Sequence, residues 1–275
     1  DLFDFGDQEK LRARARNAIL LLELNDCDAG YSPTEFQRSH LPSEYQYKVS
    51  TIFDGIDTNF WRPVDHPSRH VGGWDLPADK KVVTYVSRGM ESMRGFDLFM
   101  RIAKKVCDQR DDVIFVVAGE DRVAYGGDHR ITGGKTFKQW VLSQDRYDLD
   151  RILFLGRIPG DQLVNLFSLS DLHLYLTAPF VLSWSMMDAL ACGCVVMGSD
   201  TAPVREMIEV GTNGELFDFF DIDAADDSVN DVLDHPVEYQ AMRSRALEFI
   251  QDAYSLEKCF PRLLDLYART ASKSR

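Results

Sequence analysis

Two arginines and two glycines gather in the segment Ser87–Gly95, directly after a run of β-branched residues. Arginine offers a planar fork of N–H donors that matches phosphate oxygens, and glycine lets the main chain approach a ligand closely. A helix beginning near Gly95 would add the positive end of its dipole. Arg88, Gly89 and Arg94 are therefore candidate phosphate-binding residues, although the same spacing also fits a turn with solvated arginines.

A second candidate region is Ala178–Gly193, which reads as a strand end followed by a helix start. Ser183 is the expected N-cap, and the free main-chain N–H groups at such a start can hold an anion. Asp188 lies about one turn inside the helix, so its carboxylate can reach hydroxyl groups of a ligand near the helix start. The alternative is an ordinary capped core helix with Asp188 in solvent.

Two further loops follow apolar runs. Gly119–Trp140 carries Glu120 and Tyr125, and it is either a binding lid or a surface insertion, since long loops in compact domains serve both roles. The turn Gly156–Pro159 could offer main-chain groups to the edge of a base.

These loops need a scaffold, and the chain supplies an alternation of strands and helices. Six apolar runs predict strands: Lys81–Ser87, Asp112–Ala118, Ile152–Gly156, Leu172–Leu176, Val195–Gly198 and Gly214–Phe217. Helical spacing predicts helices at Phe96–Cys107, Asp161–Leu169, Leu182–Ala191 and Val204–Ile208. The alternation indicates an α/β fold with a doubly wound parallel sheet, which binds ligands beyond the carboxyl ends of its strands.

The flanking segments have other patterns. Gln8–Leu24 is predicted as a helix, Ser32–Glu35 begins a second one that closes at Leu41-Pro42, and Val49–Phe53 is a short strand. Asn59–Asp79 is rich in Pro, His and Gly and reads as a connector. Pro236–Ala271 is predicted to be helical. Two breaks are expected in that tail, near Tyr254 and Pro261.

Composition excludes several classes. The net charge of −13 and the pI of about 4.9 argue against broad nucleic-acid binding. A run of about 18 apolar residues is lacking, and the N-terminus lacks the order of a signal peptide. It also lacks a Met, so we expect a fragment. The five cysteines are irregularly spaced, which favours reduced, mostly buried thiols in a cytoplasmic protein, and we expect no metal.

The order of these motifs resembles a known family. SRGMESMRG, VVAGED, ILFLGRIP, SDLHLYL, FVLSWSMMDALACGCVVMGSD and REMIEVGTNGELF together resemble the C-terminal, donor-binding domain of retaining GT-B glycosyltransferases of group 1 (family 4-like). The resemblance covers roughly Val49–Ile250, and Asp54–Thr58 fits the family's crossover between its two domains. It implies a Rossmann-like sheet, with residues 1–58 as an N-terminal helical remnant of the acceptor domain plus the crossover. Residues 59–255 would be the nucleotide-sugar domain, and 256–275 the C-terminal crossing helix.

The resemblance also implies roles. An arginine and a lysine in the first loop would hold the donor diphosphate and act in catalysis, and Arg88 and Arg94 match them, with arginine replacing the lysine. Asp188 matches the glutamate that binds the ribose hydroxyls, one methylene shorter. Main chain before the helix would contact phosphate, and the turn after ILFLG would approach the base. The implied donor-binding residues are Gly89, Glu120, Arg157, Ile158, Phe180, Val181, Leu182, Ser183 and Asp188.

Two departures from the family pattern stand out. Phe180 occupies a position where the family often has an acidic residue, and Leu182-Ser183 replaces the usual Phe-Gly pair. A variant site is favoured over a dead one, because Ser183 still offers an N–H and a hydroxyl.

The functional hypothesis is hexosyl transfer from a UDP-, GDP- or ADP-linked sugar to a glycan or other acceptor, as in polysaccharide biosynthesis. This chain would supply the donor half, inactive without an N-terminal acceptor domain. No nucleic acid is expected as a partner, and peripheral membrane association of the whole protein stays open. The alternatives are a non-catalytic GT-B binding or scaffold module and a nucleotide-sugar epimerase.

Overall fold

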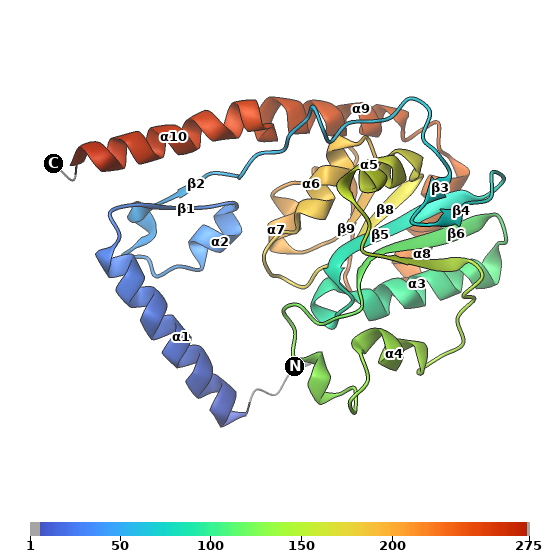
Figure 1. Cartoon of the computed structure of the whole chain (residues 1–275), viewed down its shortest axis with the longest axis horizontal. Helices are drawn as coiled ribbons and strands as arrows, with labels where there is room; N and C mark the ends of the chain where they lie inside the picture. The colour runs from blue at the N-terminus through green and yellow to red at the C-terminus, as the bar shows by residue number, and fades with distance from the viewer. Residues whose placement is uncertain (1–5, 274–275) are drawn as a thin grey trace. The chain divides into compact units, whose positions relative to one another are not determined.

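The computed structural model describes residues 6–273, which form two compact units (Figure 1). The larger unit is Asp54–Cys259, and the smaller one combines the chain before Asp54 with the chain after Cys259. All the candidate site residues named above lie in the larger unit.

A six-stranded parallel sheet forms the centre of the larger unit. Its strands are β5 (Lys81–Gly89), β6 (Val113–Glu120), β7 (Ile152–Gly156), β8 (Leu172–Tyr175), β9 (Val196–Ser199) and β10 (Glu215–Phe217). Their spatial order is β10-β9-β8-β5-β6-β7, and every neighbouring pair is parallel. The chain starts at the centre with β5, winds outward to β7, and returns on the other side of β5 as β8 (Figure 1). This confirms the predicted doubly wound, Rossmann-like α/β sheet.

Helices cover both faces of the sheet, as continuously apolar parallel strands require. Val83 of β5 packs in one apolar cluster with α3 (Phe96–Gln109) and α8 (Ile222–Asp234). Its neighbour Val82 points to the opposite face, because side chains alternate along a strand, and packs in a second cluster with α5 (Gly160–Leu169). In Figure 1, α5 lies above the strands and α3 below them.

Several predicted boundaries shift in the structure. Strand β5 continues past Ser87 because Gly89 pairs with Glu120 of β6, so Arg88 lies within the strand end. Helix α6 begins at Trp184 and ends at Ala191, and α7 spans Ala202–Arg205 rather than Val204–Ile208.

Other elements were absent from the prediction. Helix α4 (Phe137–Leu142) interrupts the long loop after β6, and its start is fixed by a capping box between Thr136 and Gln139. A two-stranded hairpin, β3 (His70–Val71) and β4 (Trp74–Asp75), lies in the connector. Helix α8 was missed as well. Short elements of this kind carry too few residues for periodicity to reveal them, whereas α8 has 13 residues but falls in an acidic stretch.

The helical tail holds one correct and one wrong prediction. Helix α9 (Gln240–Phe249) passes into a π-helical turn, η4 (Ile250–Tyr254), that ends at the predicted break. The break near Pro261 is wrong, because Pro261 lies inside the continuous helix α10 (Leu256–Lys273). Near a helix start, a proline removes only one main-chain hydrogen bond, here to the carbonyl four residues earlier, and the helix tolerates it.

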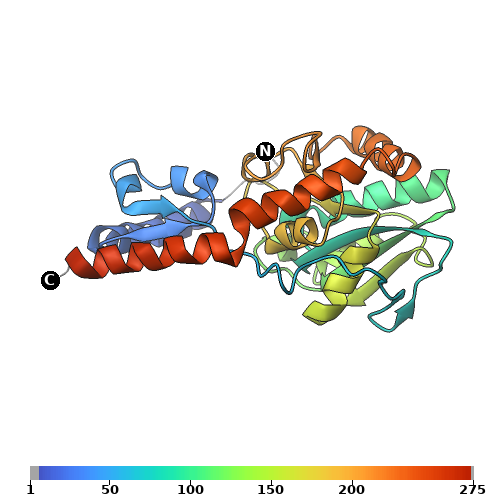
Figure 2. The same ribbon diagram turned by 90° about the horizontal axis from the view of Figure 1, so that it is seen from above.

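The smaller unit is built around two short parallel strands, β1 (Gly30–Ser32) and β2 (Val49–Thr51). Helix α1 (Asp7–Asp26) precedes them, and α2 (Glu35–Ser39) lies between them. Thr34 caps α2 by accepting a hydrogen bond from the Gln37 N–H, which confirms the predicted helix start. The C-terminal part of α10 lies beside these strands (Figure 2).

No helix within residues 6–273 combines the length and the apolar character needed to cross a membrane.

The close approach of the ends of β5 and β6 requires a glycine at position 119. Gly119 has a φ of +149°, and a Cβ at this position would overlap the carbonyl oxygen of Ser87 on β5. Replacing Gly119 by Ala is therefore expected to lower the free energy of unfolding by about 1–3 kcal/mol, measured by urea denaturation. Gly73→Ala is the control, since Gly73 also has a positive φ, +81°, but open space around it. Equal losses for both variants would contradict the predicted overlap.

Candidate functional site

The topology selects one place at the carboxyl edge of the sheet. The strand order reverses between β5 and β8, and doubly wound sheets bind ligands at this switch point. Arg94 ends a short 3₁₀ turn, η2 (Ser92–Arg94), on the loop that leaves β5. Its guanidinium reaches across the switch point to the residues that follow β8.

The guanidinium of Arg94 is buried and bound only by neutral groups. The residue is 5% exposed, and its Nη1 donates to the Thr177 hydroxyl at 3.1 Å, the Val181 carbonyl at 3.0 Å and, more weakly, the Tyr175 hydroxyl at 3.4 Å. Within residues 6–273, no ion pair joins Arg94 to a carboxylate. A buried charge without a counter-charge is costly, so an anion from outside the chain is its natural partner.

Two aromatic rings cover the same guanidinium. The ring centre of Tyr125 lies 5.4 Å from the Arg94 guanidinium carbon, and that of Phe180 lies 5.3 Å from it. Both distances fit cation–π attraction, which offsets part of the cost of burying the charge. Phe180, which stands where an acid was expected, therefore contacts Arg94 through its ring.

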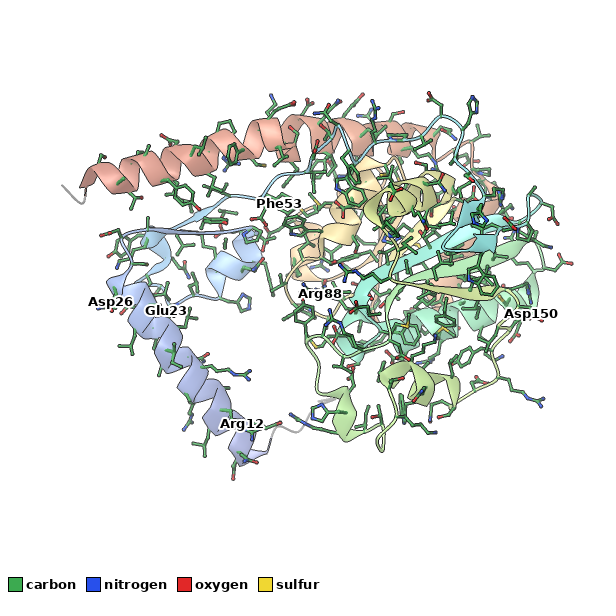
Figure 3. The ribbon with its side chains drawn as sticks, viewed as in Figure 1. Arg12, Glu23, Asp26, Phe53, Arg88 and Asp150 are labelled. Carbon is green, nitrogen blue, oxygen red and sulfur yellow. The ribbon has the colours of Figure 1, made fainter. Side chains whose placement is uncertain are left out.

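Arg88 lies at the carboxyl end of β5 and is exposed (Figure 3). Its Nη1 donates to the Tyr125 hydroxyl at 3.1 Å. Gly89, the next residue, allows close packing of main chains, since a Cβ there would lie 2.5 Å from the Arg122 carbonyl oxygen. The two candidate arginines thus share Tyr125 as a neighbour.

Helix α6 begins as predicted at an N-cap, Ser183, whose hydroxyl accepts from the Ser185 N–H at 3.4 Å. The main-chain N–H of Ser183 already donates to the Tyr175 hydroxyl at 2.7 Å, so it is engaged within the protein rather than free for phosphate. Val181 uses its carbonyl for Arg94, and Leu182 is buried. The expected main-chain phosphate contacts would therefore need a rearrangement here.

Asp188 is not the solvated side chain of the alternative interpretation. It is 7% exposed, and its Oδ1 is buried without a hydrogen-bond partner within the described chain. Burial raises the pKa of this carboxyl to about 7. A buried acceptor that lacks a donor fits a site where ligand hydroxyl groups would supply one.

Glu120, Arg157 and Ile158 form a separate group at the ends of β6 and β7. Glu120 pairs with Arg122 at 2.5 Å and with the exposed Arg157 at 3.6 Å. Ile158 packs against the apolar cluster beneath it. In the described chain, no side-chain hydrogen bond or ion pair links this group to Arg88 or Arg94, although Glu120 pairs in the sheet with Gly89, the neighbour of Arg88.

Sequence reasoning missed two residues near the candidate arginines. Tyr125 was noticed only as part of a long loop, and Glu91 was not considered. Glu91 could have been found as the one acidic residue between Arg88 and Arg94. Tyr125 carried no local signal, because its partners come from other loops.

Neither the cysteines nor any cluster of metal-binding side chains forms a second candidate site in the described chain. Four of the five cysteines are buried, and all five are free thiols, as the irregular spacing predicted. Burial raises the pKa of the Cys194 thiol to about 12 and also raises that of Cys192. Residues 6–273 contain no group of three His, Cys, Asp or Glu side chains placed to hold a metal ion.

The larger unit is an α/β protein with a doubly wound sheet, and at its switch point lies a buried arginine, Arg94, without a carboxylate partner among residues 6–273. The chain belongs to the family of glycosyl transferases group 1, whose family model matches residues 70–249. Residues 3–61 match a second model, the glycosyl transferase family 4 group.

Two curated relatives support this assignment at low identity. The N-acetyl-alpha-D-glucosaminyl L-malate synthase of Bacillus anthracis is 22% identical over 90% of this chain and 60% of its own length. The D-inositol 3-phosphate glycosyltransferase of Mycolicibacterium smegmatis is 24% identical over 83% of this chain and 49% of its own length. The chain therefore spans only about half to three-fifths of these relatives.

Solved structures show the same fold. Sucrose-phosphate synthase from Thermosynechococcus elongatus superposes with a TM-score of 0.76 at 18% identity, over 98% of this chain and 65% of that one. The Anabaena protein HepE, in complex with UDP and glucose, gives a TM-score of 0.72 at 16% identity, over 92% and 66% of the two chains. These GT-B neighbours match the parallel sheet flanked by helices.

Proposed function

We propose that this chain is the donor-binding part of a retaining glycosyltransferase that takes a hexosyl group from a nucleoside diphosphate sugar. The observation that carries the proposal is Arg94, a buried cation at the switch point with no carboxylate partner in the described chain. A diphosphate is the anion that the family's chemistry supplies there. The HepE structure, with UDP bound to a protein of the same fold, supports this choice.

The proposed chemistry is a displacement at the anomeric carbon. The bond between that carbon and the phosphate oxygen breaks, and its electron pair leaves with the diphosphate. An acceptor oxygen forms the new bond on the same face of the sugar from which the diphosphate leaves, as retention of configuration requires, and releases its proton to the surrounding water. Arg88 and Arg94 stabilise the charge that develops on the departing diphosphate, without a metal.

The remaining candidate residues bind the nucleoside. Asp188 accepts hydrogen bonds from ribose hydroxyls through its unpaired Oδ1. Arg157 and Ile158, at the end of β7, approach the base, and Glu120 orients Arg157 through their ion pair. The main chain of Val181 and Leu182 turns toward phosphate once the donor displaces the Arg94 contact to the Val181 carbonyl.

Turnover is proposed to need an acceptor-binding part outside this chain, because the chain covers only 60% and 49% of its curated relatives. We place the whole protein in the cytoplasm, in polysaccharide biosynthesis.

The test is isothermal titration of the chain with UDP, GDP and ADP. Binding of one of them, with a tenfold or greater preference over the others, is the expected result. Absence of binding for all three would overturn the proposal.

A second candidate, a non-catalytic module, is favoured by one observation: Phe180 in place of an acid. Product analysis of the full-length protein separates the candidates. A transferred sugar supports the transferase, an isomerised donor supports an epimerase, and an unchanged donor supports the module.

A further inference from the structure

Among the hydrogen bonds and ring contacts of residues 6–273, those of Tyr125 alone involve the side chains of both candidate arginines. Its hydroxyl accepts a hydrogen bond from Arg88 at 3.1 Å, and its ring lies 5.4 Å from the Arg94 guanidinium. The residue is 47% exposed, so its position is not explained by burial in a core. It comes from the loop between β6 and α4, whereas Arg88 lies at the end of β5 and Arg94 in the loop that follows it.

The three distances around Arg94 define how the rings lie. Tyr125 and Phe180 are 5.1 Å apart, nearly the same as their distances of 5.4 and 5.3 Å from the guanidinium. Rings on opposite faces of the guanidinium would be about twice as far apart. Both rings therefore lie on one side of Arg94, and they hold it from that side.

Glu91 fixes the main chain that carries Tyr125. Its carboxylate is 0% exposed, and its Oε2 accepts the N–H groups of three consecutive residues: Ala124 at 3.0 Å, Tyr125 at 2.7 Å and Gly126 at 2.8 Å. Three charge-assisted hydrogen bonds on one oxygen hold a loop in a single conformation. The other oxygen, Oε1, is buried and has no partner in the described chain, so every hydrogen bond of this carboxylate goes to the loop.

A second tie joins the same two loops. Asp128 accepts a hydrogen bond from the Ser92 N–H at 2.9 Å and another from the Ser92 hydroxyl. The loop after β6 is therefore attached to the loop after β5 on both sides of Tyr125. These hydrogen bonds therefore hold the main chain at Tyr125 in place, and only side-chain rotation is left free.

We propose that Tyr125 is a positioning residue that holds Arg88 and Arg94 in the geometry needed to bind one diphosphate, and that Glu91 acts through Tyr125. This inference rests on the proposed function, since it assumes that the two arginines bind the diphosphate. Neither residue touches the reacting atoms. Tyr125 restricts the conformations of the Arg88 and Arg94 side chains. Glu91 fixes the main chain at Tyr125 and so the position and orientation of its ring.

The experiment compares affinities for UDP and UMP by isothermal titration, or for the GDP and GMP or ADP and AMP pair if the unmodified chain binds that base. Tyr125→Phe keeps the ring and removes the bond to Arg88. It is expected to weaken the diphosphate about two- to tenfold, the range for one exposed hydrogen bond, and to leave the monophosphate nearly unchanged. Glu91→Gln is expected to act in the same direction, because a neutral oxygen holds the three N–H groups less firmly.

The double variant tests whether Glu91 acts through Tyr125. Glu91→Gln should cause little further loss of diphosphate affinity in a Tyr125→Ala background, since coupled residues are not additive. Asp226→Asn is the matched control: Asp226 is 1% exposed, and it bonds Gln109 and Lys105 away from the strand ends. That variant should lower the melting temperature but keep the ratio of the two affinities. Tyr47→Phe, at a residue 79% exposed in the smaller unit, controls for loss of a hydroxyl.

The outcomes separate the two proposals. If the unmodified chain binds the diphosphate and Arg94→Ala abolishes this, while both Tyr125 variants bind normally, only the positioning role is overturned. Additive losses for Glu91 and Tyr125 would overturn the link between them. If the unmodified chain binds no nucleotide, the proposed function itself fails.

Discussion

Replacing Arg94 by Ala is expected to weaken binding of a nucleoside diphosphate roughly 100-fold. Removing one partner of a buried, hydrogen-bonded charge pair costs about 2–5 kcal/mol, and each 1.4 kcal/mol is a factor of ten. Arg94 meets this condition, because it is 5% exposed and its own protein partners are neutral. The measurement is isothermal titration with the diphosphate that the unmodified chain prefers.

The fold is expected to tolerate the same change. Arg94→Met removes a buried charge that lacks a counter-charge in the described chain, and its side chain fills much of the space. Its melting temperature should stay close to that of the unmodified chain. Affinity should fall as far as in the alanine variant, because the lost group is the charge.

Arg243 offers a matched control for Arg94. It also donates to main-chain carbonyls, those of Ser170, Asp171 and Gly193, but these residues precede β8 and β9 and so lie at the opposite edge of the sheet. Arg243→Ala should lower the melting temperature and leave diphosphate affinity unchanged. A similar loss of affinity in both variants would mean that Arg94 acts through stability, not through the ligand.

The sheet could be predicted because each strand is a local pattern. The run Lys81–Ser87 is rich in β-branched residues, which is typical of a strand covered on both faces, and it did form the central strand β5. The same reasoning placed Arg88 and Arg94 at a strand end, and the N-cap Ser183 at the start of α6. Short-range spacing is enough for such features.

The environment of the candidate site could not be predicted in the same way. The burial of Arg94 depends on rings from two other loops, Tyr125 and Phe180. The three N–H groups that meet Glu91 come from a loop whose shape has no sequence period. The sequence also left Asp188 open between a solvated and a ligand-facing side chain, and only packing shows that it is buried.

Replacing Asp188 by Asn is expected to stabilise the chain at pH 8 and to remove one source of its pH dependence. The carboxyl has an ordinary pKa of 3.8, and burial raises the folded-state pKa to about 7. Below pH 3.8 the group is neutral in both states. Between these two values the unfolded chain releases the proton and the folded chain keeps it, so the free energy of unfolding falls as pH rises. Above pH 7 the loss is complete, on the order of 4 kcal/mol at about 1.4 kcal/mol per pKa unit.

The difference between Asp188→Asn and the unmodified chain isolates this group, since all other titrations cancel. Urea denaturation at pH 5.5, 7 and 8.5 should show the variant gaining relative stability as pH rises to about 7 and no further. Asp112→Asn should instead be less stable than the unmodified chain by an amount that does not change from pH 5.5 to 8.5, because hydrogen bonds from Arg110 lower the pKa of Asp112 and its carboxylate is ionised in both states throughout this range. Parallel stabilities for Asp188→Asn and the unmodified chain from pH 5.5 to 8.5 would contradict the raised pKa.

The loss of folding stability caused by the buried Asp188 carboxyl is explained by its proposed role in binding ribose. An ionised carboxylate is the better acceptor for two ribose hydroxyls, and their hydrogen bonds would lower its pKa when the nucleotide binds. Binding should therefore release a proton near pH 7, which titration in buffers of different ionisation enthalpy detects. Asp188→Asn should bind the diphosphate more weakly and release no proton. A variant that is more stable and yet binds less is what a buried, unsatisfied acceptor kept for a ligand requires, whereas a purely structural aspartate would give a more stable chain with unchanged binding.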